Sequence, residues 1–260
     1  MRNVKEQEEL YARLDDMKKR AVRGEIGISA FFSPREVHYA KEYLAKGGVP
    51  FFAYGGYADA ERKKIYVLPE YMEGVSMPEE LEQYGEQVGI CAVRARGSGF
   101  CSLCHRDFMG SLLGMGIERD VIGDIIMTGE HEALVICESQ IAGFLVSEWR
   151  EVGHDRIKCS QAEITEDFIP ERKFAQINDT VASARLDCVV AAVCNLARER
   201  ARECVVSELC EVDYECESRP DKDVSAPCLI SVRGYGKFRI LSIGGQTKKG
   251  RLRISAQKFL

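Results

Sequence analysis

The chain has 260 residues, 45% of them hydrophobic and 30% charged, which is typical of a folded globular protein long enough for two or three domains. Its net charge of −5 argues against a protein that is basic along its whole length. No apolar run approaches the roughly 20 residues that span a bilayer, and residues 1–20 lack the apolar core of a signal peptide, so we expect a cytoplasmic protein with no membrane partner.

The first part of the chain has the pattern of a small α/β domain. Apolar residues recur at helical spacing through residues 4–23, which predicts an amphipathic helix. The motif Ser33-Pro34-Arg35-Glu36 predicts the start of a second helix, because it combines a serine cap, a proline in the first turn and a glutamate three residues after the cap. That helix should end at the following glycine pair. Two strands are predicted after it, at residues 49–54 and 64–68.

The middle of the chain alternates strand and helix patterns. It follows residues 69–86, an acidic run with proline and no clear period, which we interpret as a linker. The predicted order is βαββαβ, with a turn at residues 128–129, helices at 106–115 and 139–150, and strands at 87–96, 124–127, 131–137 and 156–159. This is the order of the ferredoxin-like fold, which RNA-recognition modules share with many other proteins. The aromatic signature of those modules is absent, and a fold alone does not give a function.

Two short helices rich in arginine are predicted within residues 183–208, after a polar stretch at residues 161–178. Apolar residues recur with a helical period in both helices, so the two should pack on each other. Arg198, Arg200 and Arg202 should flank the apolar stripe of the second helix. Asp187 should lie in the first turn of the first helix, where a carboxylate meets the positive end of the helix dipole.

The last part of the chain has the pattern of strands. They are predicted at residues 210–214, 229–232 and 237–241, followed by a basic loop hinged by glycine at residues 244–250 and a final strand. In that final strand Arg251 and Arg253 share one face, so basic residues should line the outer face of a sheet.

Together these patterns predict an α+β protein with three domains. They are a small N-terminal α/β domain at residues 1–80, a ferredoxin-like, RNA-recognition-like domain at residues 81–165, and a domain of two helices and a small antiparallel sheet at residues 177–260.

Charge is divided unevenly along the chain. Residues 181–260 hold 14 Lys and Arg against 10 Asp and Glu, a net charge of +4, whereas the remaining residues hold 22 and 31, a net charge of −9. No acidic residue follows Asp223, but eight cations do. A basic region of this kind indicates a polyanionic partner at this end of the chain.

Eleven cysteines are scattered through the chain without a secretory signal, so most should be buried, reduced side chains. Residues 101–105 read CSLCH, the pattern of covalent haem attachment, but no export signal accompanies it. As a zinc site the pair is incomplete, because no second Cys-x-x-Cys or His pair supplies the other ligands. We therefore expect no metal and no cofactor.

Two other triplets resemble catalytic motifs. Residues 105–107 read HRD as in the protein kinases, but the asparagine required five residues after the aspartate is Leu112, so Asp107 should only help to start a helix. Residues 185–187 read RLD, similar to the triplet that holds the catalytic aspartate of pseudouridine synthases. A helix continues after Asp187 where those enzymes have a turn, so a cap or an ion pair is the favoured role.

The combination of motifs resembles two families. Residues 185–187 (RLD), 196–201 (LARERA), 212–214 (VDY) and 230–234 (ISVRG) are similar to the RNA-binding domain named after ribosomal protein S-four. Upstream, residues 55–57 (GGY), 60–63 (AERK), 105–107 (HRD), 114–116 (GMG) and 122–125 (IGDI), with Gly110 and Leu112, are similar to the YlmH family of bacterial proteins. This chain departs from the S-four pattern at Ala197, Glu208, Asp213 and Cys228, where a serine, a glycine, an asparagine and an aspartate are usual.

The resemblance implies an RNA-binding protein without enzymatic activity. Its partners would be ribosomal RNA, tRNA and the large ribosomal subunit, with no small-molecule substrate, in ribosome-associated quality control of stalled translation. The side chains that we expect at the RNA are Arg185, Asp187, Arg198, Arg200, Arg202, Arg233, Lys237, Arg239, Lys248, Lys249, Arg251 and Arg253. The alternative is an RNA-modifying enzyme, similar to pseudouridine synthases, which would need a concave pocket of converging polar groups around Asp187 or His105. A protein-interaction scaffold whose basic end is incidental is the third hypothesis.

Overall fold

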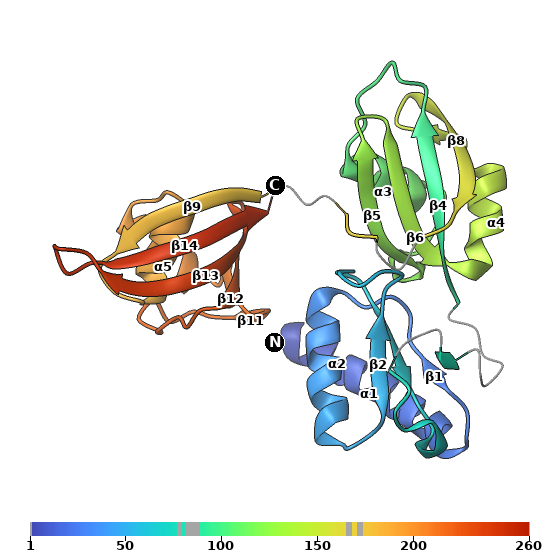
Figure 1. Ribbon diagram of the computed structural model, residues 1–260, viewed down its shortest axis with the longest axis horizontal. Coiled ribbons are helices and arrows are strands. Elements are labelled where there is room, and N and C mark those ends of the chain that lie inside the picture. Colours follow the sequence, from blue (N-terminus) through green and yellow to red (C-terminus); the bar gives the residue numbers. More distant parts are fainter. Residues whose placement is uncertain (1, 77–79, 82–88, 165–167, 171–173, 260) are drawn as a thin grey trace. The chain divides into compact units, whose positions relative to one another are not determined.

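The structure is a computed structural model that describes residues 2–76, 80–81, 89–164, 168–170 and 174–259. The chain divides into two compact units, Met1–Pro170 and Glu171–Leu260. Both mix helices with antiparallel sheets, so the α+β class is confirmed (Figure 1). In the described part of the chain, no helix is long and apolar enough to cross a membrane.

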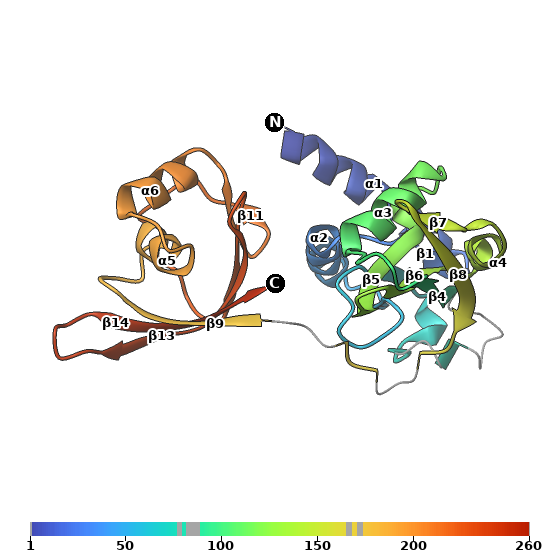
Figure 2. The same ribbon diagram turned by 90° about the horizontal axis from the view of Figure 1, so that it is seen from above.

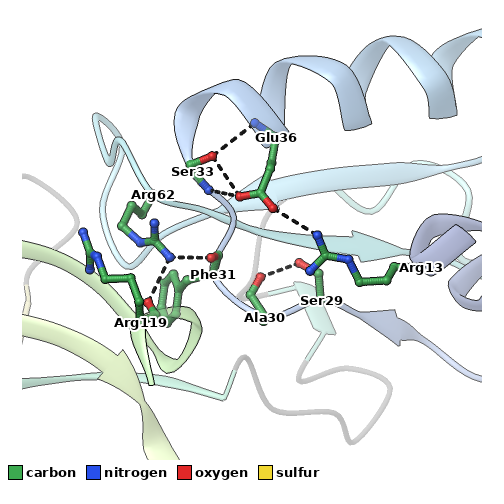
Figure 3. Close-up of polar contacts among 8 residues, drawn as sticks. All are labelled: Arg13, Ser29, Ala30, Phe31, Ser33, Glu36, Arg62 and Arg119. Atoms are coloured by element: carbon green, nitrogen blue, oxygen red, sulfur yellow. Dashed lines mark hydrogen bonds and ion pairs between the residues drawn. The ribbon is translucent and has the colours of Figure 1, made fainter. Parts of the chain in front are cut away.

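The first unit begins with a three-stranded antiparallel sheet covered by two helices. The helices are α1 (Arg2–Val22) and α2 (Pro34–Lys46), and the sheet has the order β1 (Gly27–Ile28), β3 (Lys64–Val67), β2 (Phe51–Tyr54). The predicted capping box is present, since the Ser33 hydroxyl accepts from the Glu36 N–H and the Glu36 carboxylate accepts from the Ser33 N–H (Figure 3). The helix ends at Gly47, as its sequence predicts.

The run interpreted as a linker lies partly on this sheet. A short 3₁₀ helix, η1 (Glu70–Met72), follows β3, and the side chains of Met72 and Leu81 are buried with Phe52. Residues 77–79 and 82–86 of the predicted linker lie outside the described residues. The described part is therefore packed against the first sheet.

The second half of this unit is a five-stranded antiparallel sheet with the order β5-β6-β4-β8-β7. Its helices, α3 (His105–Gly114) and α4 (Ser139–Glu148), pack on one face over a core that includes Phe108 and Trp149. The 3₁₀ helix η3 (Arg119–Val121) precedes the second strand of the sheet. The strands are β4 (Ile90–Gly97), β5 (Ile122–Gly129), β6 (Glu132–Glu138), β7 (Glu151–Val152) and β8 (Asp155–Ala162).

The predicted elements occur in the predicted order, with two corrections. A short strand that was not predicted, β7, lies between α4 and β8 and pairs with β8. The turn between β5 and β6 lies at residues 130–131 instead of 128–129, because Gly129 still pairs with Glu132 and the Thr128 hydroxyl bonds to the Glu132 carboxylate at 3.0 Å. Residues 87–88 of the first predicted strand lie outside the described residues.

The two halves of the first unit are joined by polar contacts. The Asp124 carboxylate on β5 accepts from the Tyr57 hydroxyl at 2.6 Å and from the N–H groups of Glu61 and Arg62 at 2.7 and 3.0 Å. The Arg62 guanidinium donates to the carbonyls of Phe31 and Arg119 at 2.6 and 3.0 Å (Figure 3). One aspartate and one arginine thereby fix the loop after β2 to the second sheet.

The second unit is a six-stranded antiparallel sheet with the order β11-β10-β12-β13-β14-β9. Both helices, α5 (Leu186–Val193) and α6 (Arg198–Val206), pack on one side of it (Figure 2). The core between them contains Val189, Val190, Phe238 and Ile240. The strands are β9 (Phe174–Val181), β10 (Cys210–Val212), β11 (Glu215–Cys216), β12 (Cys228–Val232), β13 (Gly236–Gln246) and β14 (Leu252–Phe259).

Two predictions for this region are wrong in part. The polar stretch predicted at residues 161–178 contains the end of β8 and the start of β9, a strand that pairs with β14 along its whole length. A polar sequence is compatible with β9 because it lies at the edge of the sheet. The predicted loop at 244–250 begins later, since Gly244 and Gln246 still pair with β14 and residues 247–251 connect the strands. Arg251, predicted in the final strand, therefore precedes β14, which begins at Leu252.

Candidate nucleic-acid interface

Asp187 holds two arginines at the helix pair. Its carboxylate is 1% exposed and accepts from Nε of Arg185 and Nε of Arg198, both at 3.1 Å, and from the N–H of Cys188 at 2.9 Å. Burial alone would raise the pKa of Asp187, but the hydrogen bonds from both arginines outweigh it and keep the pKa below its ordinary value. The carboxylate is thus ionised at neutral pH and orients two guanidiniums that remain 38% and 59% exposed.

The other two arginines of α6 pair with acids of the same helix. Arg200 contacts Glu203 at 2.7 Å, and Arg202 contacts Glu199 at 3.7 Å, with all four side chains more than half exposed. Exposed pairs of this kind contribute only about 0.3–0.5 kcal/mol, so an RNA phosphate could displace either acid at low cost.

A second group of cations lies on the sheet. Phe238 and Ile240 of β13 point into the core, so the alternating Lys237 and Arg239 point to the outer face. On β14 the buried Ile254 alternates with the exposed Arg253 in the same way. The prediction that basic residues line the outer face is borne out for these three side chains.

The hairpin between β13 and β14 carries three more of the predicted cations. Lys248 and Lys249 are exposed in its loop, which projects beyond the two helices (Figures 1 and 2). Arg251 is held against the neighbouring β9, where its guanidinium donates to the Thr180 hydroxyl at 2.9 Å and to the Thr180 carbonyl. Arg233 is exposed in the turn between β12 and β13.

Two groups of the predicted site residues therefore lie on opposite faces of the unit, apart from those in the hairpin and turn. The helices cover one face of the sheet, and the side chains of Lys237, Arg239 and Arg253 are on the other. The sequence showed the cations but not this separation, which depends on the side of the sheet that the helices cover.

The departures from the S-four pattern have visible effects. Ala197 at the start of α6 makes no side-chain cap, whereas a serine there could accept from the helix N–H groups. Glu208 adopts φ 57°, a left-handed conformation that favours the glycine usual at that position.

Asp213 and Tyr214 correct the strand predicted at residues 210–214. They form the two-residue turn between β10 and β11, with φ 48° and 71°, and the strand ends at Val212. The Asp213 carboxylate accepts from the Leu229 N–H at 2.8 Å, so this acid ties the turn to β12.

A third basic surface lies on the middle sheet and was not predicted. Arg94 and Arg96 alternate along β4 on the face opposite α3 and α4, and Lys158 is the direct partner of Arg96 on β8. Arg156, two residues before Lys158, shares this face. Glu132 contacts Arg94 and Arg96 at 3.8 and 2.8 Å. The sequence did indicate this surface, because cations occupy every second position in two of the predicted strands.

The rest of that face is closed. Leu134 and Ile136 of β6 and Ala92 of β4 are buried against Phe31 and Tyr57 from the first half of the unit. Among the described residues, the accessible part of this face is the end of the sheet that carries the cations.

The cysteine motif lies at the surface, and the ring of His131 bonds to the Cys101 carbonyl at 2.6 Å. Cys101 and Cys104 are exposed, and the Asp107 carboxylate accepts from the Cys104 N–H at 2.8 Å as the start of α3 requires. Across the described ranges, no group of three or more His, Cys, Asp or Glu side chains is placed to hold a metal ion.

Comparison with known proteins shows a related family, a related sequence and a similar fold. Residues 87–166 match the family described as "Putative RNA-binding domain in YlmH". Over 231 residues, 89% of this chain and 86% of the relative, the sequence is 26% identical to ribosome-associated protein quality control protein P2 of Bacillus subtilis (strain 168). The fold is similar to that of cell division protein YlmH from Streptococcus pneumoniae, with a TM-score of 0.52 and 17% identity over 63% of this chain and 95% of that one. The resemblance to the YlmH family is thereby confirmed.

Proposed function

The chain is related to the YlmH proteins, and on this premise we propose that it binds RNA on the large ribosomal subunit, contacting ribosomal RNA and tRNA. It would act in the cytoplasm in ribosome-associated quality control of stalled translation. The Bacillus subtilis relative is a ribosome-associated protein quality control protein, which supports the ribosomal part of this proposal. The observation that carries the proposal is the run of eight cations after Asp223, uninterrupted by an acid and carried by a sheet and a projecting hairpin. Such an arrangement supplies phosphate contacts to folded RNA.

The fold supports the same proposal at a finer level. Strands β5, β6, β4 and β8 lie side by side with two helices on one face, which supports a ferredoxin-like, RNA-recognition-like assignment for residues 81–165. The helix pair, the Arg185–Asp187–Arg198 cluster and the small sheet support an S-four RNA-binding domain at residues 177–260. The proposed N-terminal domain at residues 1–80 has its own three-stranded sheet, within the same compact unit as the middle domain.

Binding without chemistry is the function that the Asp187 geometry favours. A nucleophilic carboxylate must be free to reach a substrate, but Asp187 is 1% exposed and its oxygens are bonded to Arg185 and Arg198. A cavity of about 340 Å³ lies between α1 and α2, lined by Arg13, Ser33 and neighbouring residues, and neither Asp187 nor His105 lines it. We therefore propose that Asp187 has a structural role in RNA recognition.

A pull-down with and without nuclease tests this function. The tagged protein, expressed in a bacterial cell, should retain large-subunit ribosomal RNA and tRNA, and nuclease treatment should release both together with most ribosomal proteins. Recovery of partner proteins that is indifferent to nuclease, without enrichment of RNA, would instead indicate a protein-interaction scaffold. A variant in which Lys248, Lys249 and Arg253 are changed to alanine is compared with the parent, and it should retain less RNA.

A further inference from the structure

The outer face of the six-stranded sheet in the second unit carries aromatic rings beside its cations. Phe174 is the direct cross-strand partner of Phe259, and the two rings lie 5.0 Å apart in an edge-to-face arrangement. The pairing of Arg239 with Gln257, two residues before Phe259 on the same strand, puts the rings on the same face as Arg239. No prediction from sequence included these rings, because they come from opposite ends of the unit.

The cations of this face lie over the rings. The Arg239 guanidinium carbon is 5.4 Å from the centroid of Phe259 and 5.9 Å from that of Phe174. The Lys237 ammonium is 5.1 Å from the centroid of Phe259 and 5.9 Å from that of Tyr214. These five side chains, Phe174, Tyr214, Lys237, Arg239 and Phe259, form what we call the aromatic face.

Amide side chains continue the same surface. Gln176 of β9 pairs with Gln257 of β14, and Asn178 pairs with Ser255, in the positions that alternate with the inward residues of these strands. Amides and hydroxyls both donate and accept hydrogen bonds, as base edges require. Among the described strand residues, the alternation of side chains places one acid on this face, Glu211 of β10, and β12 separates it from β13.

We propose that the aromatic face binds unpaired bases of single-stranded RNA by stacking, which deepens the RNA binding proposed above and rests on it. Unpaired bases stack on phenylalanine rings and on arginine planes, and cations next to those rings take the adjoining phosphates. The helices of this unit pack on the opposite side of the sheet (Figure 2). The outer face therefore presents rings, cations and amides together. An acidic protein segment would use the cations but would have no need of the ring and amide positions.

The proposal predicts a contact that depends on bases and is distinct from phosphate binding elsewhere in the unit. The test compares two probes, an oligouridylate of about 12 nucleotides, within the range that single-strand-binding folds cover, and an abasic oligomer of the same length. The parent protein should bind the oligouridylate more tightly. Phe259→Leu and Phe174→Leu keep apolar volume and charge but remove the ring, so each should weaken oligouridylate binding about tenfold and leave the abasic oligomer unchanged. Since no charge is lost, the salt dependence should also stay the same.

Two further variants keep the test decisive. Arg239→Lys retains the charge but loses the plane that a base can stack on, so it should also reduce the preference for bases. Phe100→Leu changes a ring that is 93% exposed in the other unit and should have no effect. Thermal unfolding of each variant checks that it is folded.

Each outcome has a distinct meaning. If the parent binds RNA but the ring variants bind oligouridylate as well as the parent does, the aromatic face does not take bases and the inference is overturned while the proposed function stands. Suppose instead that the ring variants bind oligouridylate as the parent does but recover fewer ribosomal proteins after nuclease treatment. The aromatic face then binds protein, and the inference is likewise overturned. If the parent binds neither probe nor ribosomal RNA, the proposed function itself fails.

Discussion

Arg198 at the start of α6 lies 3.0 Å from Asp187 in the first turn of α5, so one ion pair joins the two helices of the second unit. The carboxylate is buried and the guanidinium is largely exposed, which leaves the arginine able to contact a ligand while its position is fixed. A contact of this type orients a cation before RNA arrives, so less side-chain freedom is lost on binding.

Removing the carboxylate should loosen this arrangement. In Asp187→Asn a neutral amide replaces the buried charge that Arg185 and Arg198 share, and we expect a loss of about 1–3 kcal/mol in the free energy of unfolding. Urea unfolding, followed by circular dichroism, measures it. Glu203→Gln is the control, because its pair with Arg200 is exposed and should contribute less than about 0.5 kcal/mol. Equal stability of Asp187→Asn and the parent would contradict the structural role.

The same aspartate should not modify RNA. The purified protein should leave uridines unchanged in ribosomal RNA and tRNA, because the carboxylate oxygens of Asp187 are hydrogen-bonded to two arginines. Chemical mapping of pseudouridine after incubation is the measurement. Pseudouridine that forms with the parent and disappears with Asp187→Asn would establish the enzyme instead.

Stability should fall in acid because of Glu217. Hydrogen bonds from Arg219, opposed by burial and helped by Lys222, lower the pKa of Glu217 from 4.5 to about 2. The unfolded chain therefore binds a proton that the folded chain excludes, and the stabilisation, complete above about pH 4.5, is lost as the pH falls toward 2. Glu217→Gln should show a flatter dependence over this interval, whereas Glu199→Gln, whose side chain is 77% exposed, should follow the parent. Parallel curves for Glu217→Gln and the parent would contradict the assignment.

Affinity for RNA should depend strongly on salt. If about five or six cations meet phosphates, the log–log slope should be roughly −4 for single-stranded-like RNA, and Arg202→Ala should reduce it by about one unit for all sequences. Arg198→Ala should do the same, but it also removes a partner of buried Asp187, so its stability must be measured alongside. Changing Lys18 and Lys19 is the control, since they pair with Asp15 and Asp16 at 3.1 and 2.8 Å. A slope near zero would exclude phosphate contacts as the basis of binding.

The purified protein should contain no stoichiometric metal or haem. Cys101 and Cys104 are exposed, and among the residues that the structure describes no further side chains join them in the set of ligands that a closed zinc site needs. Elemental analysis and a visible absorption spectrum of protein prepared without chelators measure this. One zinc per chain, or a haem band, would contradict it.

Local signals in the sequence were sufficient for most elements of the fold. The Ser33–Glu36 capping box is a contact between neighbours in sequence, so it could be predicted without knowing the tertiary structure. Strand β9 could not, because an edge strand with one exposed face has no continuous apolar pattern and is stabilised by β14, which lies at the other end of the domain.

The site was predictable in its residue types but not in its arrangement. The cations could be counted, yet which of them share a face depends on the side of the sheet to which the helices pack. The pairing of Phe174 with Phe259 depends on a strand that the sequence pattern did not indicate. Arg94 and Arg96 alternate with buried residues on β4, so charged residues at every second position indicate a strand with one exposed face.

Sedimentation of the tagged protein with and without splitting of ribosomes tests the central claim most directly. The parent should be recovered with free large subunits, and Arg198→Ala and Arg202→Ala should reduce that recovery while the Lys18 and Lys19 variant does not. If the two arginine variants sediment with ribosomal particles as the parent does and the lysine variant is lost from them, the RNA-binding surface lies at the other end of the chain.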